Sequence, residues 1–345
     1  MIVLGIETSC DETACALVRS DKVILAHLVR TQLKEHQMFG GVVPEVAARS
    51  HLHTLYPLVQ ECLLQADVNP EQIDAIAATT GPGLIGGVMV GASFAKGLAL
   101  GLNKPFIAVN HLEAHALTPR LTHDVPFPYL LLLVSGGHCQ ILIAHGVGHY
   151  TQLGSTIDDA VGEAFDKTAK LLGLGYPGGP ALESQAKAGN PNRFILPKPL
   201  AHMAGCDFSF SGLKTAVRQL IESTHPMTDQ DRADICASFQ KTVALVMISR
   251  LKNAMKMLAD REVVVGTLVM AGGVAANQYI CSAVKEFAEK YELAFVAPPL
   301  SLCTDNGAMV AWAGLERLQM GACDGLDTSC RPRWPLQELT PLMEI

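Results

Sequence analysis

The chain has 345 residues, of which 49% are hydrophobic and 17% charged, and its formal net charge is −7. This composition excludes a disordered chain and is large enough for two lobes with sizeable cores. The negative balance argues mildly against a nucleic-acid partner, since phosphate binding favours a positive field, although a local basic patch would escape this test.

Neither an export signal nor a membrane span is expected. The first residues, MIVLGIETSCDE, lack the basic and long apolar regions of a signal peptide and are typical of a buried strand. No run of eighteen apolar residues is present, so no span is predicted. The ten cysteines form no C-x-x-C pair, which favours free thiols in the cytoplasm over a thiolate zinc site.

Two passages with the same pattern predict an internal duplication. Each half opens with an apolar strand, a small polar turn and a second strand, as in IVLGIETS and PYLLLLVSGGHCQ. Each half later has an apolar strand that ends at glycines before a helix. We expect two α/β lobes, residues 1–125 and 126–345, that face each other across a cleft. A helical insertion at about 156–262 is predicted in the second lobe, and the C-terminal segment is expected to pack back on the first.

Three turns with small residues are candidate nucleotide contacts. They are GIETSCDET at 5–13, LVSGGHCQ at 133–140 and VMAGGVAAN at 269–277. Backbone N–H groups in such turns can hold phosphate oxygens, and glycine lets the ligand approach the backbone. None of the three is a P-loop or a clean G-x-G-x-x-G motif.

The stretch VNHLEAH contains two histidines four residues apart. On a helix, His111 and His115 share one face, so both imidazoles can reach one metal. Glu113 lies about 200° round the helix from His111 and points away. In the H-E-x-x-H metalloproteases the acid directly follows the first histidine, so a protease would lack its base here. An ordinary histidine pair remains the alternative.

A third donor stands in SLCTDNGAM, where Asp305 precedes an apolar helix. Its ordinary role would be an N-cap. Two histidines and one carboxylate nevertheless suit iron(II), zinc or manganese with positions left open for a substrate. On the duplicated frame the histidines end the first lobe and Asp305 ends the second, so a metal would bridge the lobes.

Together, motifs that include GIETSCDET, FGGVVPEVAARSH, NHLEAH, VSGGHCQ, YPGGP, FSFSGLKTA and CTDNGAMVAWAG resemble the TsaD family. These are bacterial tRNA threonylcarbamoyladenosine transferases, formerly described as glycoproteases. The resemblance runs from Met1 to about Leu336 and implies the duplicated fold of actin, Hsp70 and sugar kinases. It also implies transfer of a threonylcarbamoyl group from threonylcarbamoyl-AMP to N6 of the adenosine 3′ of the anticodon, in tRNAs that read codons beginning with A.

The resemblance further implies site residues. His111, His115 and Asp305 would hold one divalent metal, iron(II) or alternatively zinc(II), and Asp11 would be a further ligand or assist proton transfer. The adenylate, and ATP or ADP in the same cleft, would contact Val134, Ser135, Gly136, Gly137, His138, Asp166, Gly179, Glu183 and Asn277.

Three positions depart from the family pattern. Glu183 stands where many members have Asp, so its substrate contact is less firmly implied. Cys139 and Ala275 stand where members usually have Thr and Ser. Hydrogen bonds from those two hydroxyls are therefore in question, while backbone contacts from the same turns are retained.

The implied reaction is an acyl transfer to a poor amine nucleophile, which requires orientation and stabilisation of charge on the carbonyl oxygen. Asp11 and His138 are both candidate general bases. The alternatives are an ATPase or small-molecule kinase on the same fold, an Hsp70-like module, and a metalloprotease. The first two leave the two histidines and the aspartate without a role.

The resemblance implies several partners, but no membrane. They are tRNA, a paralogous TsaB-like subunit that binds the first lobe, a small TsaE-like ATPase, and a TsaC-like enzyme that makes the donor. Residues 81–102, GPGLIGGVMVGASFAKGLALGL, are either a contact helix or a buried core helix. Basic side chains of the insertion are either a tRNA surface or a solvated face: Lys187, Arg193, Lys198, Lys214 and Arg218.

Overall fold

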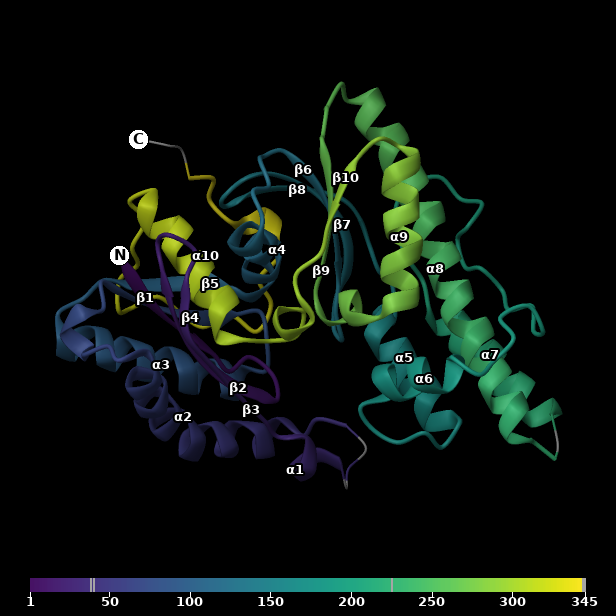
Figure 1. Ribbon diagram of the computed structural model, residues 1–345, viewed down its shortest axis with the longest axis horizontal. Helices are drawn as coiled ribbons and strands as arrows, with labels where there is room; N and C mark the ends of the chain where they lie inside the picture. The colour runs from purple at the N-terminus through teal and green to yellow at the C-terminus, as the bar shows by residue number, and fades with distance from the viewer. Residues whose placement is uncertain (38, 40, 225, 343–345) are drawn as a thin grey trace. The chain divides into compact units, whose positions relative to one another are not determined.

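The computed structural model describes all residues except 38, 40, 225 and 343–345. The chain divides into two compact units. The first consists of Met1–Val125, His145–Tyr150 and Thr304–Ile345, and the second of Pro126–Ala144 and Thr151–Cys303. Each unit is built on one five-stranded sheet (Figure 1).

The sheet of the first unit has the order β3-β2-β1-β4-β5. Strands β1, β2 and β3 are antiparallel neighbours, whereas β1, β4 and β5 run parallel. The central strands β1 and β4 are buried almost throughout and mostly apolar, because helices cover both faces of the sheet. The strands are β1 (Ile2–Glu7), β2 (Glu12–Arg19), β3 (Ile24–Thr31), β4 (Ala75–Gly81) and β5 (Phe106–Asn110).

Helices α2 and α3 cover one face of this sheet and α10 covers the other (Figure 1). Helix α10 lies very close to the sheet, because a Cβ atom on Gly5 of β1 would be only 2.2 Å from the backbone nitrogen of Ala311. Gly307 meets the backbone of Cys15 in the same way, at 2.3 Å. The helices of this unit are α1 (Leu33–Gln37), α2 (Pro44–Ala66), η1 (Pro70–Gln72), α3 (Ile85–Leu102), α4 (His111–Thr122), α10 (Gly307–Gln319) and η4 (Leu336–Glu338).

The sheet of the second unit has the order β10-β9-β6-β7-β8. Strand β6 is antiparallel to β7 and parallel to β9, as β1 is to β2 and β4. The two sheets therefore share one topology, and the predicted duplication is confirmed. The strands are β6 (Tyr129–Val134), β7 (Cys139–Gly146), β8 (His149–Ser155), β9 (Thr267–Ala271) and β10 (Ala294–Val296).

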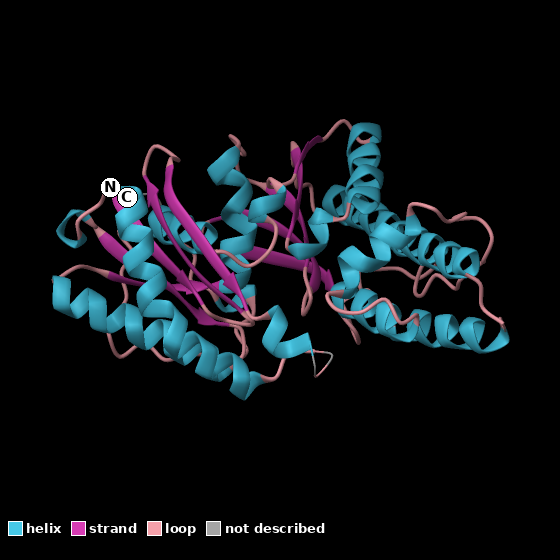
Figure 2. Cartoon of the chain, turned by 60° about the horizontal axis from the view of Figure 1, so that its bottom comes forward, coloured by secondary structure: helices cyan, strands magenta, loops and turns pink. Residues whose placement is uncertain are grey.

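Helices α5 to α8 occupy the predicted insertion, and α8 packs against α6 and α9 (Figure 2). Helix α8 begins with a capping box in which Thr228 and Asp231 satisfy each other's backbone N–H groups. The helices of this unit are α5 (Val161–Leu171), α6 (Gly178–Ala186), α7 (Ser211–Ser223), α8 (Asp229–Asp260), η2 (Gly273–Ala276), α9 (Gln278–Lys290) and η3 (Leu300–Leu302).

By length and composition alone, α3 could cross a membrane, which the sequence analysis did not expect. A core helix passes the same test, so a single such helix is a weak indication. Its small residues face the sheet: Gly87 and Gly91 lie against Thr8, whose hydroxyl donates to the Gly87 carbonyl at 2.8 Å. The glycines let α3 pack closely, while its Ile, Val, Leu, Met, Phe and Ala residues make it apolar.

The close approach of α10 predicts the cost of a single methyl group. Gly5→Ala should lower the free energy of unfolding by about 3 kcal/mol, because backbone atoms of α10 occupy the space of the new Cβ. Gly97→Ala, at an exposed position of α3 with nothing within 4 Å, should instead stabilise by about 0.5–1 kcal/mol. Urea unfolding of both variants measures the difference, and a harmless Gly5→Ala would contradict the packing described.

Candidate functional site

His111, His115 and Asp305 lie together in the first unit. One donor atom of each lies within 4.8 Å of the others. Asp305 Oδ1 is 3.0 Å from His115 Nε2 and 3.4 Å from His111 Nε2. Both histidines are buried, while the Asp305 side chain is 20% exposed. The three residues could hold one divalent cation with positions open toward solvent.

The local sequence explains why the two imidazoles point to one spot. Strand β5 ends at Asn110, whose side-chain oxygen caps α4 by accepting from the N–H groups of Leu112 and Glu113. The Asn110 amide also donates to the Trp334 carbonyl at 2.8 Å. The helix therefore starts at His111, and the i, i+4 spacing brings the two rings to 4.7 Å between centroids.

One alternative for Asp305 is excluded and one expectation is corrected. Asn306, not Asp305, caps α10 by accepting from the Met309 N–H at 2.9 Å, so the Asp305 carboxylate is left to face the histidines. Asp305 also belongs to the same unit as the histidines and not to the second lobe. The reason is that α10, which follows it, packs on the first sheet. A cation held here would need no bridge between lobes.

A second layer of side chains orients His111. Glu7, at the end of β1 and fully buried, accepts from His111 Nδ1 at 3.0 Å. The Thr79 hydroxyl and the Ser9 N–H fix the Glu7 carboxylate, both at 2.5 Å. Because Nδ1 of His111 is engaged by Glu7, Nε2 is the ring nitrogen that faces Asp305 and would bind a metal. Such an arrangement is common for metal-binding histidines. Sequence reasoning missed Glu7, although a carboxylate that ends a buried strand is an unusual signal.

Charge is concentrated around these donors. Burial opposes a charged ring, but Asp305 and Glu7 outweigh it and raise the pKa of His111 to about 9. Burial, helped by Asp305 and Asp11, raises the pKa of Glu12 to about 10. The cluster thus holds protons that a cation could replace.

Asp11 lies beside this cluster, 7% exposed, and shares a side-chain hydrogen bond with Glu12. Its carbonyl accepts from the Gln32 N–H at 3.1 Å. It is not one of the three grouped donors among the described residues. Glu12 is a further acidic neighbour that sequence reasoning missed, although it follows Asp11 directly in the chain.

The predicted substrate turn, Val134 to His138, joins β6 to β7 in the second unit. The Ser135 N–H donates to the His138 carbonyl at 2.8 Å, and the Ser135 hydroxyl accepts from the His138 N–H at 3.1 Å. Gly136 and Gly137 are exposed, and a Cβ on either would meet nothing within 4 Å. The turn therefore presents backbone to open space, where side chains would otherwise stand.

Among the other predicted contacts in this unit, Asp166, Glu183 and Asn277 each have a structural partner. Asp166 accepts from the Gly178 N–H at 2.8 Å, which ties α5 to the start of α6. Next to it, Gly179 has open space around its Cα. Glu183 accepts from the Gln278 N–H at 2.8 Å, joining α6 to α9.

Asn277 caps α9 by accepting from the Ile280 N–H, and its amide donates to Gln240 at 3.2 Å. Glu183, Gln240, Gln278 and Tyr279 all line one cavity of about 430 Å³. A cavity of this size between α6, α8 and α9 fits a small ligand. Among the predicted residues, the structure thus gathers Glu183 and the partner of Asn277 at one cavity, and Asp166 and Gly179 at the α5–α6 junction.

Of the three departures from the family pattern, Cys139 and Ala275 are buried. Cys139 begins β7 and is fully buried, which raises the pKa of its thiol well above the usual range. Ala275 lies in η2 and is 3% exposed. Neither side chain offers a polar group to solvent in this chain.

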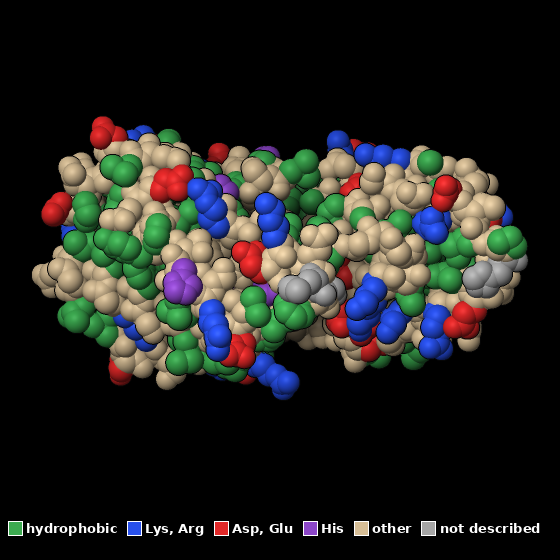
Figure 3. Space-filling view, turned by 90° about the horizontal axis from the view of Figure 1, so that it is seen from below, with side chains coloured by type: hydrophobic (Ala, Val, Ile, Leu, Met, Phe, Trp, Pro, Cys, Tyr) green, Lys and Arg blue, Asp and Glu red, His purple; other side chains and the backbone are tan. Residues whose placement is uncertain are grey.

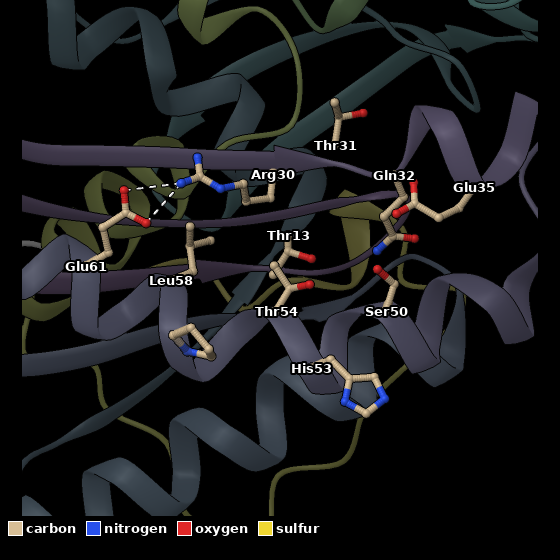
Figure 4. A pocket seen from close by; sticks show the side chains of 11 residues that line it. Thr13, Arg30, Thr31, Gln32, Glu35, Ser50, His53, Thr54, Leu58 and Glu61 are labelled. Carbon is tan, nitrogen blue, oxygen red and sulfur yellow. Dashed lines mark hydrogen bonds and ion pairs between the residues drawn. The ribbon is translucent and has the colours of Figure 1, made fainter.

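Another cavity, of about 300 Å³, lies in the first unit among β3, α1 and α2 (Figure 4). Its walls are polar, but the guanidinium of Arg30 is bound by both carboxylate oxygens of Glu61, at 3.2 and 2.9 Å. None of the predicted site residues lines it.

Comparisons with known proteins identify the family of this chain. The model of the TsaD family, tRNA N6-adenosine threonylcarbamoyltransferase, matches residues 23–312. A protein of that name from Paramagnetospirillum magneticum (strain ATCC 700264 / AMB-1) is 58% identical over 337 residues, 97% of each chain. One from Sinorhizobium medicae (strain WSM419) is 56% identical over 343 residues, 97% of this chain and 95% of that one.

Among solved structures, component A of the (R)-2-hydroxyglutaryl-CoA dehydratase of Acidaminococcus fermentans has a TM-score of 0.52 and 16% identity, and the match covers 92% of this chain and 98% of that one. At this identity the likeness concerns the fold alone. It confirms the predicted actin, Hsp70 and sugar-kinase class.

Asn277 allows a test that separates a structural role from substrate contact. Asn277→Ala should cost about 1–2 kcal/mol of stability, because α9 loses its cap. Asn277→Asp keeps an equivalent cap and should stay within about 0.5 kcal/mol of the wild type. Chemical unfolding of both variants measures this, and equal losses would show that the cap is not what Asn277 contributes.

Proposed function

The chain belongs to the TsaD family of tRNA N6-adenosine threonylcarbamoyltransferases, and we propose on this basis that two buried histidines and one partly exposed aspartate hold a metal that the reaction needs. The activity is transfer of the threonylcarbamoyl group from threonylcarbamoyl-AMP to N6 of the adenosine 3′ of the anticodon, in tRNAs that read codons beginning with A. The observation that supports the metal is the convergence of His111, His115 and Asp305.

The donor set fits the proposed cation. Two imidazoles and one carboxylate suit iron(II), with zinc(II) as the alternative. The Glu7 contact to His111 provides the second-layer orientation that such sites need. When bound, the cation would polarise the carbonyl oxygen of the donor or act as a template for its threonyl end.

The residues of the chain have two tasks in the transfer. The carbonyl of the adenylate is already activated, so the amine must be oriented and the growing charge on oxygen must be stabilised. Backbone N–H groups of the turn Val134–His138 are suited to hold the donor, since Gly136 and Gly137 leave that space open. Asp11 and His138 stay the two candidates for accepting the proton from N6.

The adenosine part of the donor, or ATP or ADP, would enter the cavity between α6, α8 and α9. Tyr279, 38% exposed at its wall, offers an aromatic face to a base. Glu183 and Gln240 offer carboxylate and amide groups for the sugar and the base edge. Asp166 of α5 and Gly179 at the start of α6 would contact the adenylate from the α5–α6 junction.

The alternatives account for less. A kinase or ATPase would use the same turns but would leave the buried histidines without a function. A metalloprotease would need Glu113 as its base, yet Glu113 is fully buried and its carboxylate is bound by Arg317 at 2.8 Å. Glu113 therefore faces away from the donors and cannot activate a water there.

Single-residue changes test the metal site. His111→Ala and His115→Ala should each lower tRNA modification more than about 100-fold, because a cation loses one of three donors. His53→Ala, an exposed histidine of α2, should retain full activity. The assay mixes protein, threonylcarbamoyl-AMP and unmodified tRNA, and counts modified adenosine by mass spectrometry.

Chelation completes that test. Treatment with a chelator should abolish transfer by the wild-type protein, and added iron(II) or zinc(II) should restore it. Which ion restores it identifies the metal. Undiminished turnover in the chelated protein or in His111→Ala would refute the metal assignment.

The partner surface is proposed to lie on α2 and α3. Between them is an apolar groove of about 570 Å³. Leu52, Tyr56 and Met89 line it and are each more than half exposed. In the view of the molecule from below, hydrophobic side chains lie on the part of the surface formed by α2 and α3 (Figure 3). Such a patch favours a protein partner, and a paralogous TsaB-like subunit is the occupant we propose. A TsaE-like ATPase and a TsaC-like donor enzyme complete the proposed system.

Ion pairs within the protein reduce the number of basic side chains that are candidates for contacts with tRNA. Arg193 is bound by Asp231 and Asp234, and Arg218 lies 3.7 Å from Glu222. These arginines are therefore engaged within the protein. Lys187, Lys198 and Lys214 are the stronger candidates for phosphate contacts.

All ten cysteines are free thiols, which agrees with the proposed cytoplasmic location.

Charge in the groove should prevent the partner from binding. Tyr56→Asp or Met89→Asp would bury a carboxylate in an apolar contact, so the complex with the TsaB-like subunit should be lost in size-exclusion chromatography at micromolar concentration. Val264→Asp, at an 84% exposed position of the second unit, is the control and should leave the complex intact. A complex that survives both groove variants would move the partner to another surface.

A further inference from the structure

Glu113 is the residue of the NHLEAH stretch that the proposed reaction does not use. It lies midway between the two histidine donors and is 0% exposed. Three groups donate to its carboxylate: Gly148 N–H at 2.7 Å and the Tyr150 hydroxyl at 3.2 Å to Oε1, and Arg317 Nη1 at 2.8 Å to Oε2. A buried carboxylate with three donors is a built feature that calls for a reason.

Net stability is a poor reason. Burying an ion pair costs desolvation that often cancels the attraction, so apolar side chains would serve a core as well. Arg317 is itself only 8% exposed. What a buried ion pair does provide is one defined arrangement of the elements that carry it, because other arrangements leave a charge unpaired.

The pair joins the two elements that carry the metal donors. Glu113 belongs to α4, which carries both histidines, and Arg317 belongs to α10, which begins two residues after Asp305. Side chains two residues apart on a helix point about 200° apart. Holding Glu113 on the far side of α4 therefore fixes the rotation of α4 about its axis. A rotation of the helix would carry both imidazoles away from Asp305.

The same carboxylate holds the tip of the β7–β8 hairpin, which belongs to the first unit. Gly148 has φ +72°, and a Cβ there would be 2.3 Å from the Thr340 carbonyl oxygen, so the tip fits closely. The Leu342 N–H donates to the Val147 carbonyl at 3.2 Å. The tip is thus enclosed by Glu113 on one side and the C-terminal segment on the other, which limits the freedom of Glu113 further.

We propose that Glu113 is a positioning residue: through Arg317 and the hairpin tip it sets the rotation of α4, and thereby the geometry of the donors His111, His115 and Asp305. The inference rests on the proposed metal site. It assigns to Glu113 no contact with metal or substrate.

The test measures metal binding directly. Glu113→Gln keeps the side-chain size but removes the charge that binds Arg317. Its affinity for cobalt(II), measured by competition with a coloured chelator, should fall about 10–100-fold, the range found when second-layer partners of a metal site are changed. The visible absorption bands of bound cobalt(II) should also shift, because the arrangement of the donors changes.

A matched control uses the second ion pair between the same helices. Arg120 donates to Glu316 at 2.8 Å, on the last turn of α4 and away from the donors. Arg120→Met should lower the melting temperature but leave cobalt(II) affinity and spectrum unchanged. Arg317→Met should reproduce the loss seen in Glu113→Gln. Arg317→Lys keeps the charge and should retain most of the wild-type affinity for cobalt(II). These two variants test the proposal even where Glu113→Gln does not fold.

Two outcomes would overturn the proposal. One is a Glu113→Gln protein that binds cobalt(II) with wild-type affinity and spectrum. The other is a loss of affinity in Arg120→Met equal to that in Glu113→Gln, since that would make the effect one of general stability. Failure of the metal site itself is seen separately, as unchanged cobalt(II) binding in His111→Ala.

Discussion

The direct contact of α10 with the first sheet is the constraint on which the site depends. Gly5 in β1 and Gly307 at the start of α10 remove the two Cβ atoms that would keep helix and strand apart. The helix can then seat its backbone on the sheet, and the residue two positions before it, Asp305, comes to face α4. A bulkier sequence at either glycine would move the third donor away from the two histidines, whatever their own spacing.

Local sequence patterns predicted much of this fold, because burial and helix geometry impose a regular order on the residues. Strands buried on both faces are apolar runs, and the same run–turn–run order occurs in both halves, so the duplication was visible without sequence identity. The histidine pair was equally visible, because helical spacing alone puts i and i+4 on one face. The sequence did not show to which unit Asp305 belongs, because that depends on where α10 packs. Close packing through two distant glycines leaves no local periodicity to read.

The partners of two glutamates could not be read from the sequence for a related reason. Glu7 was missed although it ends a buried strand, and Glu113 was expected only to point away from the metal donors. Only the tertiary structure shows that both carboxylates are fully buried and that three hydrogen-bond donors contact each of them. Buried carboxylates are rare enough that their partners define their roles. Glu7 faces the donor His111, whereas Glu113 faces Arg317 behind the helix.

The balance of charge also distinguishes the possible activities. Glu7 and Asp305 contact the histidine pair, and Asp11 lies beside Glu12 in the same largely buried region, where burial raises the pKa of Glu12 to about 10. Buried charge of one sign is costly unless protons or a cation neutralise it. Histidine side chains can donate to carboxylates or bind a metal, but a nucleotide-binding module gains nothing from concentrating acids there. A transferase that must stabilise a developing oxyanion would gain, because a cation held by such a cluster would supply positive charge to oppose it.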